Sequence, residues 1–333
     1  MHDGSPFHSS SGFASSAPGS VVEPAVEPML AALSEPRRVL VTGTTGFVGR
    51  HLVDRLLARG HRVTGLSRAP AAGPAAAGVR WRRGDVARAE TLRDVARDCD
   101  VVVHLAGAWE SADVERLEAV HVRGTENLLN EASRWEVSRF VYVSALGANP
   151  GGPAFLRTKY EAERLVRDSA LEHVILRPSV IYGPGDHFTT RLAGLLRRLP
   201  VFPVLGSGSL RLQPVSVEDV SDVLMQAVER SDVRDSVFEL AGPERLKFTK
   251  IVRIVARALD LRRPVVQVPR WLAGPTLWLA GRCGLSIPII SDQMELFRDR
   301  GTLRREDNSL RTVFHIEPLP FQVAVVDYLG ASP

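Results

Sequence analysis

The chain has 333 residues, a hydrophobic fraction of 44% and a formal charge of +4. These values suit a folded, soluble protein with one large domain, or a domain and a smaller lobe. Acidic and basic residues are interspersed, which argues against nucleic-acid binding. The two cysteines, Cys99 and Cys283, have neither a CxxC partner nor metal-ligand spacing, which argues against a disulfide framework and a metal site. No apolar run reaches membrane-spanning length, so we expect no transmembrane segment.

Residues 1–36 are rich in Ser, Ala, Gly and Pro and contain neither lysine nor arginine. This composition predicts a disordered tail. A secretory signal needs a basic region before an apolar core, and a mitochondrial presequence is rich in arginine. Neither pattern is present, so we expect a cytoplasmic protein. Met29 is an alternative translation start to Met1, because the compact pattern begins only a few residues later.

From Arg38 onward, apolar runs typical of strands alternate with segments of helical periodicity. Strands are expected at 39–41, 62–68, 79–85, 100–106, 140–144 and 174–177, and helices at 47–60, 88–98, 114–135 and 155–169. This alternation predicts an α/β fold, a doubly wound parallel sheet with helices on both faces. Ligands of such sheets bind at the carboxyl ends of the strands.

After Pro178 the pattern becomes less regular. Helices are expected at 188–199, 218–230, 248–259 and 270–283, and short strands at 212–217 and 237–240. We interpret this half as a final sheet strand with a smaller, mixed C-terminal lobe. The predicted organisation is a tail at 1–36, a core at 37–180 and a substrate-side lobe at 181–330.

The turn after the first strand is rich in glycine, with the sequence TGTTGFVG from Thr42 to Gly49. Glycines at positions 43, 46 and 49 let the backbone turn tightly and approach a ligand. The free N–H groups and the dipole of the helix that follows then favour a pyrophosphate. The turn therefore predicts a nucleotide-binding site.

This turn matches the TGxxGxxG motif of the extended short-chain dehydrogenases/reductases. Further matches lie at 84–85, 104–107, 123–129, 142–147, 158–159, 176–179, 182–186 and 217–219. The resemblance covers residues 38–260 and implies a Rossmann fold of the NAD-dependent epimerase/dehydratase superfamily. Three motifs occur in an order that is most similar to an atypical branch of this superfamily: SALGA at 144–148, RTK at 157–159 and QPV at 213–215. That branch contains the dehydrogenase-like accessory subunit of respiratory complex I and its bacterial relatives.

The resemblance implies a whole dinucleotide as the ligand. The cofactor-binding residues it implies are Thr42, Gly43, Thr45, Gly46, Phe47, Val48, Gly49, Ser67, Arg68, Asp85, Val86, Leu105, Ala106, Gly107, Lys159 and Pro178. Asp85 would contact the adenine. The second strand ends at Ser67 and Arg68 without an acid, and an arginine there accommodates a 2′-phosphate that a carboxylate would repel. NADP(H) is therefore favoured over NAD(H).

Reductases of this superfamily use a tyrosine and a lysine at positions i and i+4 of one helix, which share a face. Here Lys159 is preceded at that spacing by Phe155, whose ring cannot exchange a proton. Tyr160 is adjacent to Lys159 and points roughly 100° around the helix. Ser144, at the end of the fifth strand, would orient a substrate oxygen. We therefore predict that tyrosine-dependent hydride transfer is absent or weak.

Three functions stay open. The first is a structural or sensory NADP(H)-binding protein. The second is an active oxidoreductase or epimerase for a small carbonyl, quinone or sugar-like substrate, using Ser144, Lys159, a water and either Tyr182 or His121. The third is a regulatory module that reports the redox state of the dinucleotide pool, with residues 271–290 as a protein or peripheral membrane contact.

One position argues modestly against a nucleotide-sugar substrate. Leu212 stands where nucleotide-sugar enzymes usually carry an arginine, and Arg211 is one residue away. In a strand, a shift of one residue places the side chain on the opposite face.

Overall fold

The computed structural model describes residues 35–69, 78–109, 113–205, 208–269, 271, 301–303 and 308–330. Its centre is a parallel sheet of seven strands in the order β11-β6-β5-β4-β1-β2-β3. The strands are β1 (Arg38–Thr42), β2 (Arg62–Ser67), β3 (Val79–Arg83), β4 (Val101–His104), β5 (Arg139–Val143), β6 (Glu172–Pro178) and β11 (Ser236–Leu240). The predicted doubly wound sheet is confirmed.

The strand order reverses between β1 and β4, which are neighbours in the sheet although β2 and β3 separate them in sequence. From this point the chain winds outward in both directions. The connections leave the carboxyl ends of β1 and β4 toward opposite faces, and in doubly wound sheets the ligand-binding crevice lies at such a point. The glycine turn after Thr42 and the segment after His104 flank that crevice.

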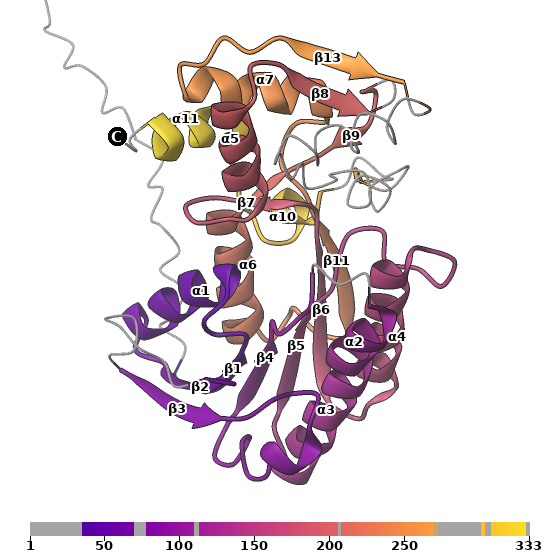
Figure 1. Cartoon of the computed structure of the whole chain (residues 1–333). Helices are drawn as coiled ribbons and strands as arrows, with labels where there is room; N and C mark the ends of the chain where they lie inside the picture. The colour runs from indigo at the N-terminus through magenta and orange to yellow at the C-terminus, as the bar shows by residue number, and fades with distance from the viewer. Residues whose placement is uncertain are drawn as a thin grey trace, which may run out of the picture. The chain divides into compact units, whose positions relative to one another are not determined.

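Side chains of the central strands alternate between the two faces of the sheet. Val39 and Val41 belong to an apolar cluster with α1 and α6, whereas Leu40 belongs to a cluster with α3 and α4. Figure 1 shows α1 and α6 on one side of the sheet and α2 to α4 on the other. The bounds of the main covering helices are α1 (Phe47–Ala58), α3 (Gly124–Arg134), α4 (Ala154–Asp168) and α6 (Val217–Glu229).

The contact between α1 and α6 combines an apolar seam with a polar network. Leu52 and Leu56 of α1 pack with Val220 and Leu224 of α6 in one fully buried cluster. Full burial of such side chains contributes about 1.5–3 kcal/mol each, whereas an exposed ion pair such as Arg55–Asp222, at 2.8 Å, contributes about 0–1 kcal/mol. The apolar seam therefore dominates the docking of these helices.

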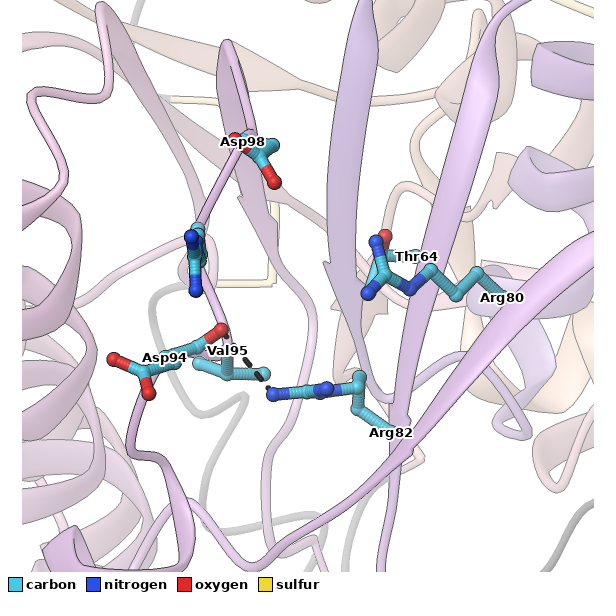
Figure 2. Close-up of a pocket in the computed structure, with 7 residues that line it drawn as sticks. Thr64, Arg80, Arg82, Asp94, Val95 and Asp98 are labelled. Carbon is cyan, nitrogen blue, oxygen red and sulfur yellow. Dashed lines mark hydrogen bonds between the residues drawn. The ribbon is translucent and has the colours of Figure 1, made fainter.

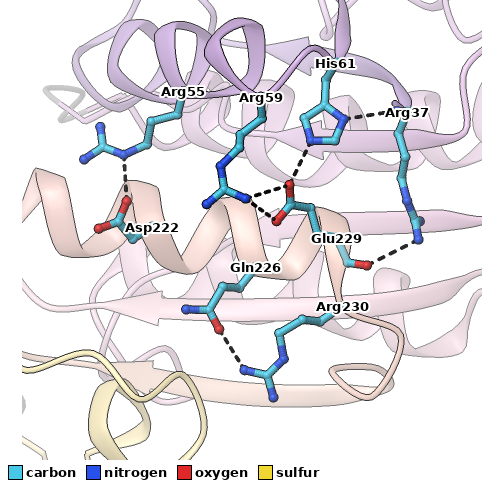
Figure 3. A network of polar contacts seen from close by, with 8 residues as sticks. All are labelled: Arg37, Arg55, Arg59, His61, Asp222, Gln226, Glu229 and Arg230. Carbon is cyan, nitrogen blue, oxygen red and sulfur yellow. Dashed lines mark hydrogen bonds and ion pairs between the residues drawn. The ribbon is translucent and has the colours of Figure 1, made fainter. Parts of the chain in front are cut away.

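Glu229, in the last turn of α6, is the hub of that network (Figure 3). It accepts hydrogen bonds from His61 Nε2 at 3.2 Å and from Arg59 Nη1 at 3.5 Å. The backbone N–H of Arg37 donates to His61 Nδ1 at 3.0 Å, so this ring nitrogen is the acceptor and Nε2 carries the proton. One carboxylate thus joins the start of β1, the end of α1 and the end of α6.

The segment predicted as one helix at 114–135 is interrupted. It consists of α2 (Val114–Glu118), a π-helical turn η3 (Ala119–Arg123) and α3. Such π turns are frequent at functional sites. Here the turn carries His121, whose side chain is buried.

The helix predicted near 88–98 is wrong. Only a 3₁₀ turn, η2 (Ala89–Thr91), forms there, and turns follow it. Asp94 and Asp98 have φ values of 60° and 61°, a left-handed backbone that ends right-handed helices. Leu92 and Val95 nevertheless pack into the core on the α3 side of the sheet. The two residues have the spacing of a helical face, but turns rather than a helix carry their side chains into the core.

The C-terminal lobe has its own apolar cluster, formed mainly by three helices. These are α5 (Phe188–Arg198), α7 (Phe248–Ala258) and α11 (Phe321–Gly330). Three strand pairs accompany them: β7 (Ile181–Tyr182) with β10 (Val215–Ser216), β8 (Phe202–Leu205) with β13 (Val265–Val268), and β9 (Arg211–Leu212) with β12 (Leu246–Lys247). A short helix, α10 (Ser309–Thr312), lies near β11.

The helix predicted at 270–283, and the contact surface predicted at 271–290, lie outside the described residues apart from Trp271. Within the described part of the chain, no helix combines the length and apolarity needed to cross a membrane.

Candidate functional site

The glycine turn approaches the end of β4 so closely that side chains are excluded. Gly43 has a φ of +69°, and a Cβ built on it would lie 2.9 Å from the backbone nitrogen of Ala106. A Cβ on Gly49 would lie 2.2 Å from the carbonyl oxygen of Gly43. The start of α1 is therefore pressed against the turn. The first N–H groups of a helix lack intrahelical partners and are the groups that would bind an anion at this place.

Beneath the turn, a buried threonine joins the ends of β1 and β4. Thr42 Oγ1 accepts a hydrogen bond from the Ala106 N–H at 3.2 Å and bonds His104 Nδ1 at 2.7 Å. Burial, and to a smaller extent the charge of Lys159, lowers the pKa of His104 to about 3. His104 is therefore neutral, and its bond to Thr42 ties the end of β4 to the end of β1.

Lys159 reaches the opposite wall from α4. Its Nζ donates to the carbonyl oxygen of Val143 at 2.9 Å and lies 5.0 Å from the centre of the Tyr142 ring. A Cβ built on Gly107 would lie 3.6 Å from Lys159 Nζ and 3.6 Å from His121 Nε2. The segment after β4 therefore meets the lysine of α4 and the histidine of the π-helical turn.

The protonation of His121 follows from its partners. Its Nε2 accepts from the Ala108 N–H at 3.1 Å, and its Nδ1 lies 2.9 Å from Thr158 Oγ1. The acceptor role of Nε2 assigns the proton to Nδ1, which donates to Thr158. Burial, reinforced by the charge of Lys159, lowers the pKa of His121 to about 2. A ring that stays neutral at physiological pH cannot serve as a cationic acid there.

The half-buried ring of Phe155 lies one helical turn before Lys159. It packs edge-on against His121, with ring centres 5.4 Å apart, and against Trp109, with ring centres 5.1 Å apart. A phenyl ring has neither a donor nor an acceptor for proton exchange, so this wall of the crevice presents a hydrocarbon surface.

Ser144 points to a buried carboxylate on α4. Its Oγ donates to Glu163 Oε1 at 2.5 Å. Arg177, on β6, donates to the same carboxylate with Nε at 2.8 Å and Nη2 at 2.6 Å, and Arg167 adds a bond at 3.1 Å. Glu163 is fully buried. Its role is not evident from the sequence motifs, although its position four residues after Lys159 places it on the same helix face.

Tyr182 lies in the C-terminal lobe. Its hydroxyl donates to the carbonyl oxygen of Leu319 at 2.8 Å, and its ring packs edge-on against Phe321 with centres 4.8 Å apart. Burial, reinforced by the charge of Asp219, raises the pKa of Tyr182 well above its usual range. Its hydroxyl is therefore occupied by a backbone partner.

The residues predicted to contact the adenosine lie at the carboxyl ends of β2 and β3. Arg68 is exposed directly after β2, and the hydroxyl of Ser67 donates to the Ala69 carbonyl at 2.7 Å. Asp85 accepts the Ala87 N–H at 3.0 Å, which forms a tight turn after β3. Val86 follows Asp85 and packs against the start of α3, since a Cβ built on Gly124 would lie 2.9 Å from Val86 Cγ2.

The remaining predicted contacts border the same edge of the sheet. Thr45 and Gly46 are exposed at the tip of the glycine turn, and Phe47 and Val48 begin α1. Pro178 ends β6, where its carbonyl oxygen accepts the Leu146 N–H at 2.8 Å.

The buried lysine predicts a measurable pH dependence of stability. Burial lowers the pKa of Lys159 from 10.5 to about 8, against the opposing effect of the Glu163 carboxylate. Between these values the unfolded chain binds a proton that the folded chain does not, so the free energy of unfolding rises with pH. Relative to Lys159→Met, the natural protein should gain about 3 kcal/mol across this window, measured by urea unfolding. If the free energies of unfolding of the two proteins change with pH in parallel, burial does not destabilise the charged form of Lys159.

Comparison with known proteins identifies a family and several relatives. The model of the "NAD dependent epimerase/dehydratase family" matches residues 39–241. A ceramide reductase of Caulobacter vibrioides is 32% identical over 247 residues, which cover 69% of this chain and 73% of that protein. The mitochondrial NADH-ubiquinone oxidoreductase 40 kDa subunit of Neurospora crassa is 28% identical over 266 residues, covering 77% of this chain and 69% of that protein.

Among solved structures, MoeE5 in complex with UDP-glucuronic acid and NAD is similar with a TM-score of 0.61 and 27% identity. The match covers 70% of this chain and 85% of that one. These findings confirm the predicted resemblance, including the one to the complex I subunit.

Proposed function

Because the chain belongs to the NAD-dependent epimerase/dehydratase family, we propose that it binds a nicotinamide dinucleotide along the carboxyl edge of the sheet. The observation that carries this proposal is the close approach of Gly43 to Ala106, where only a glycine backbone fits beside the turn at which a pyrophosphate would lie. The NAD in the MoeE5 structure and the named activities of the relatives support it. Titration of the purified protein with NADPH and NADH, followed by fluorescence and thermal shift, tests it, and no response to either would contradict it.

We further propose a preference for NADP(H), which rests on Arg68. This exposed arginine follows β2 at the position where a carboxylate would repel a 2′-phosphate. Arg68→Glu should weaken NADPH binding about tenfold or more, because a charged hydrogen bond is replaced by repulsion, while NADH binding changes little. Arg62→Glu, at the opposite end of the same strand, is the matched control. Equal affinities of the natural protein for NADPH and NADH would contradict the preference.

The catalytic part of the proposal concerns Phe155. By its resemblance to the family, Lys159 would bind the nicotinamide ribose, but the residue one turn earlier has no hydroxyl to protonate a substrate oxygen. His121 is neutral, and the hydroxyls of Ser144 and Tyr182 are engaged by Glu163 and Leu319. These observations favour a structural or sensory role for the dinucleotide over standard hydride transfer.

Restoring the tyrosine should therefore create activity. Phe155→Tyr places a hydroxyl four residues before Lys159, and we expect NADPH-dependent reduction of aldehydes or ketones to rise about 100-fold or more over the natural protein, the size of a general acid contribution. NADPH oxidation is followed at fixed substrate concentration. Phe155→Leu is the control, because it changes the packing without adding a hydroxyl. If both variants behave alike, Phe155 does not occupy the acid position.

A second function, an active oxidoreductase or epimerase, is favoured by the relatives. The Caulobacter vibrioides relative is named a ceramide reductase, and the Vibrio cholerae relative a UDP-glucose 4-epimerase. In this alternative Lys159 and an ordered water replace the tyrosine, with Ser144 released from Glu163, and Tyr182 or His121 as further candidates. Turnover of aldehydes, ketones, quinones or nucleotide sugars by the natural protein, abolished by Lys159→Ala, would establish it. The third function, a sensor acting through residues 271–290, requires a partner that responds to NADPH loading.

A further inference from the structure

A second hollow lies under the edge of the sheet, between β2, β3 and the turns that follow η2 (Figure 2). Its volume is about 300 Å³. Thr64 belongs to it and lies three residues before the end of β2, about 10 Å from the carboxyl edge. The hollow is therefore separate from the crevice at the glycine turn. Its polar walls are formed by Thr64, Arg80, Arg82, Asp94, Arg97 and Asp98.

The strand register explains why arginines line this hollow. Thr64 pairs with Arg80 and Leu66 pairs with Arg82, so both arginines share the face of β3 that looks toward the α3 side. Trp81 lies between them in sequence and packs on the opposite face, near the α1 cluster. The left-handed residues Asp94 and Asp98 prevent a helix from covering this edge. Turns run beneath the strand instead and leave the space.

Among the described residues, no carboxylate forms an ion pair with the three arginines of this hollow, Arg80, Arg82 and Arg97. Arg82 Nη2 only approaches the backbone carbonyl of Asp94, at 3.4 Å, and the Arg97 guanidinium lies 5.3 Å from the centre of the Trp135 ring. A guanidinium group has five N–H donors in a fork that matches oxyanions, and the contacts of these three arginines leave most of them for a ligand.

The two aspartates do not balance this charge. The Asp94 carboxylate lies 3.8 Å from Arg134, and Figure 2 shows it turned away from Arg80 and Arg82. Asp98 is then the one remaining carboxylate among the lining residues, against three arginines, which gives an excess of two positive charges. Like charges gathered around one hollow repel each other, and a dianion would relieve this repulsion.

We propose that this hollow binds the phosphate group of a small phosphorylated molecule, at a site distinct from the dinucleotide. A phosphate monoester carries a charge of about −1.5 to −2 at neutral pH, which matches the excess. Its oxygens accept paired hydrogen bonds from guanidinium groups, and Thr64 can donate one more. The volume lies at the lower end of the range for small-molecule sites, so the ligand is a small ester or free phosphate rather than a macromolecule.

The test is calorimetric titration of the full chain, saturated with NADPH, with inorganic phosphate and with glycerol 3-phosphate at low ionic strength. We expect saturable binding that Arg80→Gln and Arg82→Gln each weaken about tenfold or more, because each removes charge-assisted hydrogen bonds. Arg93→Gln is the matched control, since Arg93 is exposed on the same segment but does not line the hollow. Tighter binding of glycerol 3-phosphate than of phosphate would identify an ester as the ligand, and the reverse would identify free phosphate.

Absence of saturable binding would overturn the proposal, as would an equal loss of affinity in Arg93→Gln. The same holds if phosphate binds only when NADPH is omitted, because the anion would then occupy the dinucleotide crevice. Arg80 is exposed, so its replacement tests the site even if Arg82→Gln fails to fold. None of these outcomes decides whether the dinucleotide binds, because the NADPH titration measures that independently.

Discussion

Replacement of Gly49 by alanine is expected to abolish dinucleotide binding and to destabilise the fold by about 3 kcal/mol or more. The added Cβ would lie 2.2 Å from the carbonyl oxygen of Gly43 and 2.9 Å from Thr44 Cα. Both are backbone atoms, so no side-chain rotation relieves the overlap. Either α1 moves away from the turn or the turn opens, and each change displaces the N–H groups that would face a pyrophosphate. Urea unfolding and NADPH titration measure the two effects.

Gly194→Ala is the matched control for this prediction. Gly194 lies within α5, and a Cβ built on it meets no atom within 4 Å. Alanine favours helix over glycine by about 1 kcal/mol, so this variant should be slightly more stable and bind NADPH normally. Normal NADPH affinity in a folded Gly49→Ala protein would show that the close packing at the turn is not needed for the cofactor.

Removal of the Glu163 carboxylate should have the largest effect on stability outside the glycine turn. Glu163→Ala leaves Arg177 without its paired acceptor and Ser144 without its partner, in a region where Glu163 itself is fully buried. Breaking a buried ion pair costs about 3–5 kcal/mol, because the remaining charge stays desolvated. The loss is measured as a lower free energy of unfolding in urea.

Glu161→Ala provides the comparison on the same helix. Glu161 has a side chain 42% exposed and lies 3.7 Å from Arg157, so its loss should cost no more than about 0.5 kcal/mol. Glu163→Gln separates shape from charge, since it keeps the volume and one acceptor oxygen. Similar losses for the alanine variants at 161 and 163 would mean that Arg177 finds another acceptor.

The strands of the central sheet could be predicted from sequence because their signal is local. Runs such as the one around Val102 are buried on both faces and need no knowledge of their neighbours. The failed helix near 88–98 has the opposite cause. Leu92 and Val95 have helical spacing, and the left-handed backbone at Asp94 and Asp98 leaves no signature that the spacing could reveal.

The polar partners of the site depend on contacts across long stretches of chain. Ser144 and Glu163 are separated by 19 residues, and Tyr182 and Leu319 by 137. Each side chain is compatible with a catalytic position when only its own motif is considered. Only the fold reveals that the Ser144 hydroxyl donates to the Glu163 carboxylate and the Tyr182 hydroxyl to the Leu319 carbonyl oxygen.

Because α6 and β11 lie late in the chain, the sheet is neither fully covered nor complete while the protein is being synthesised. A nascent chain that ends at residue 180 lacks α6, so Leu52 and Leu56 of α1 lose part of their cover. It also lacks β11, so β6 is an unpaired edge open to other chains. At roughly 5–20 residues per second, the ribosome needs about 3–12 s to translate the next 60 residues. Co-translational aggregation therefore has its widest opportunity in that interval, before Leu240 completes the sheet.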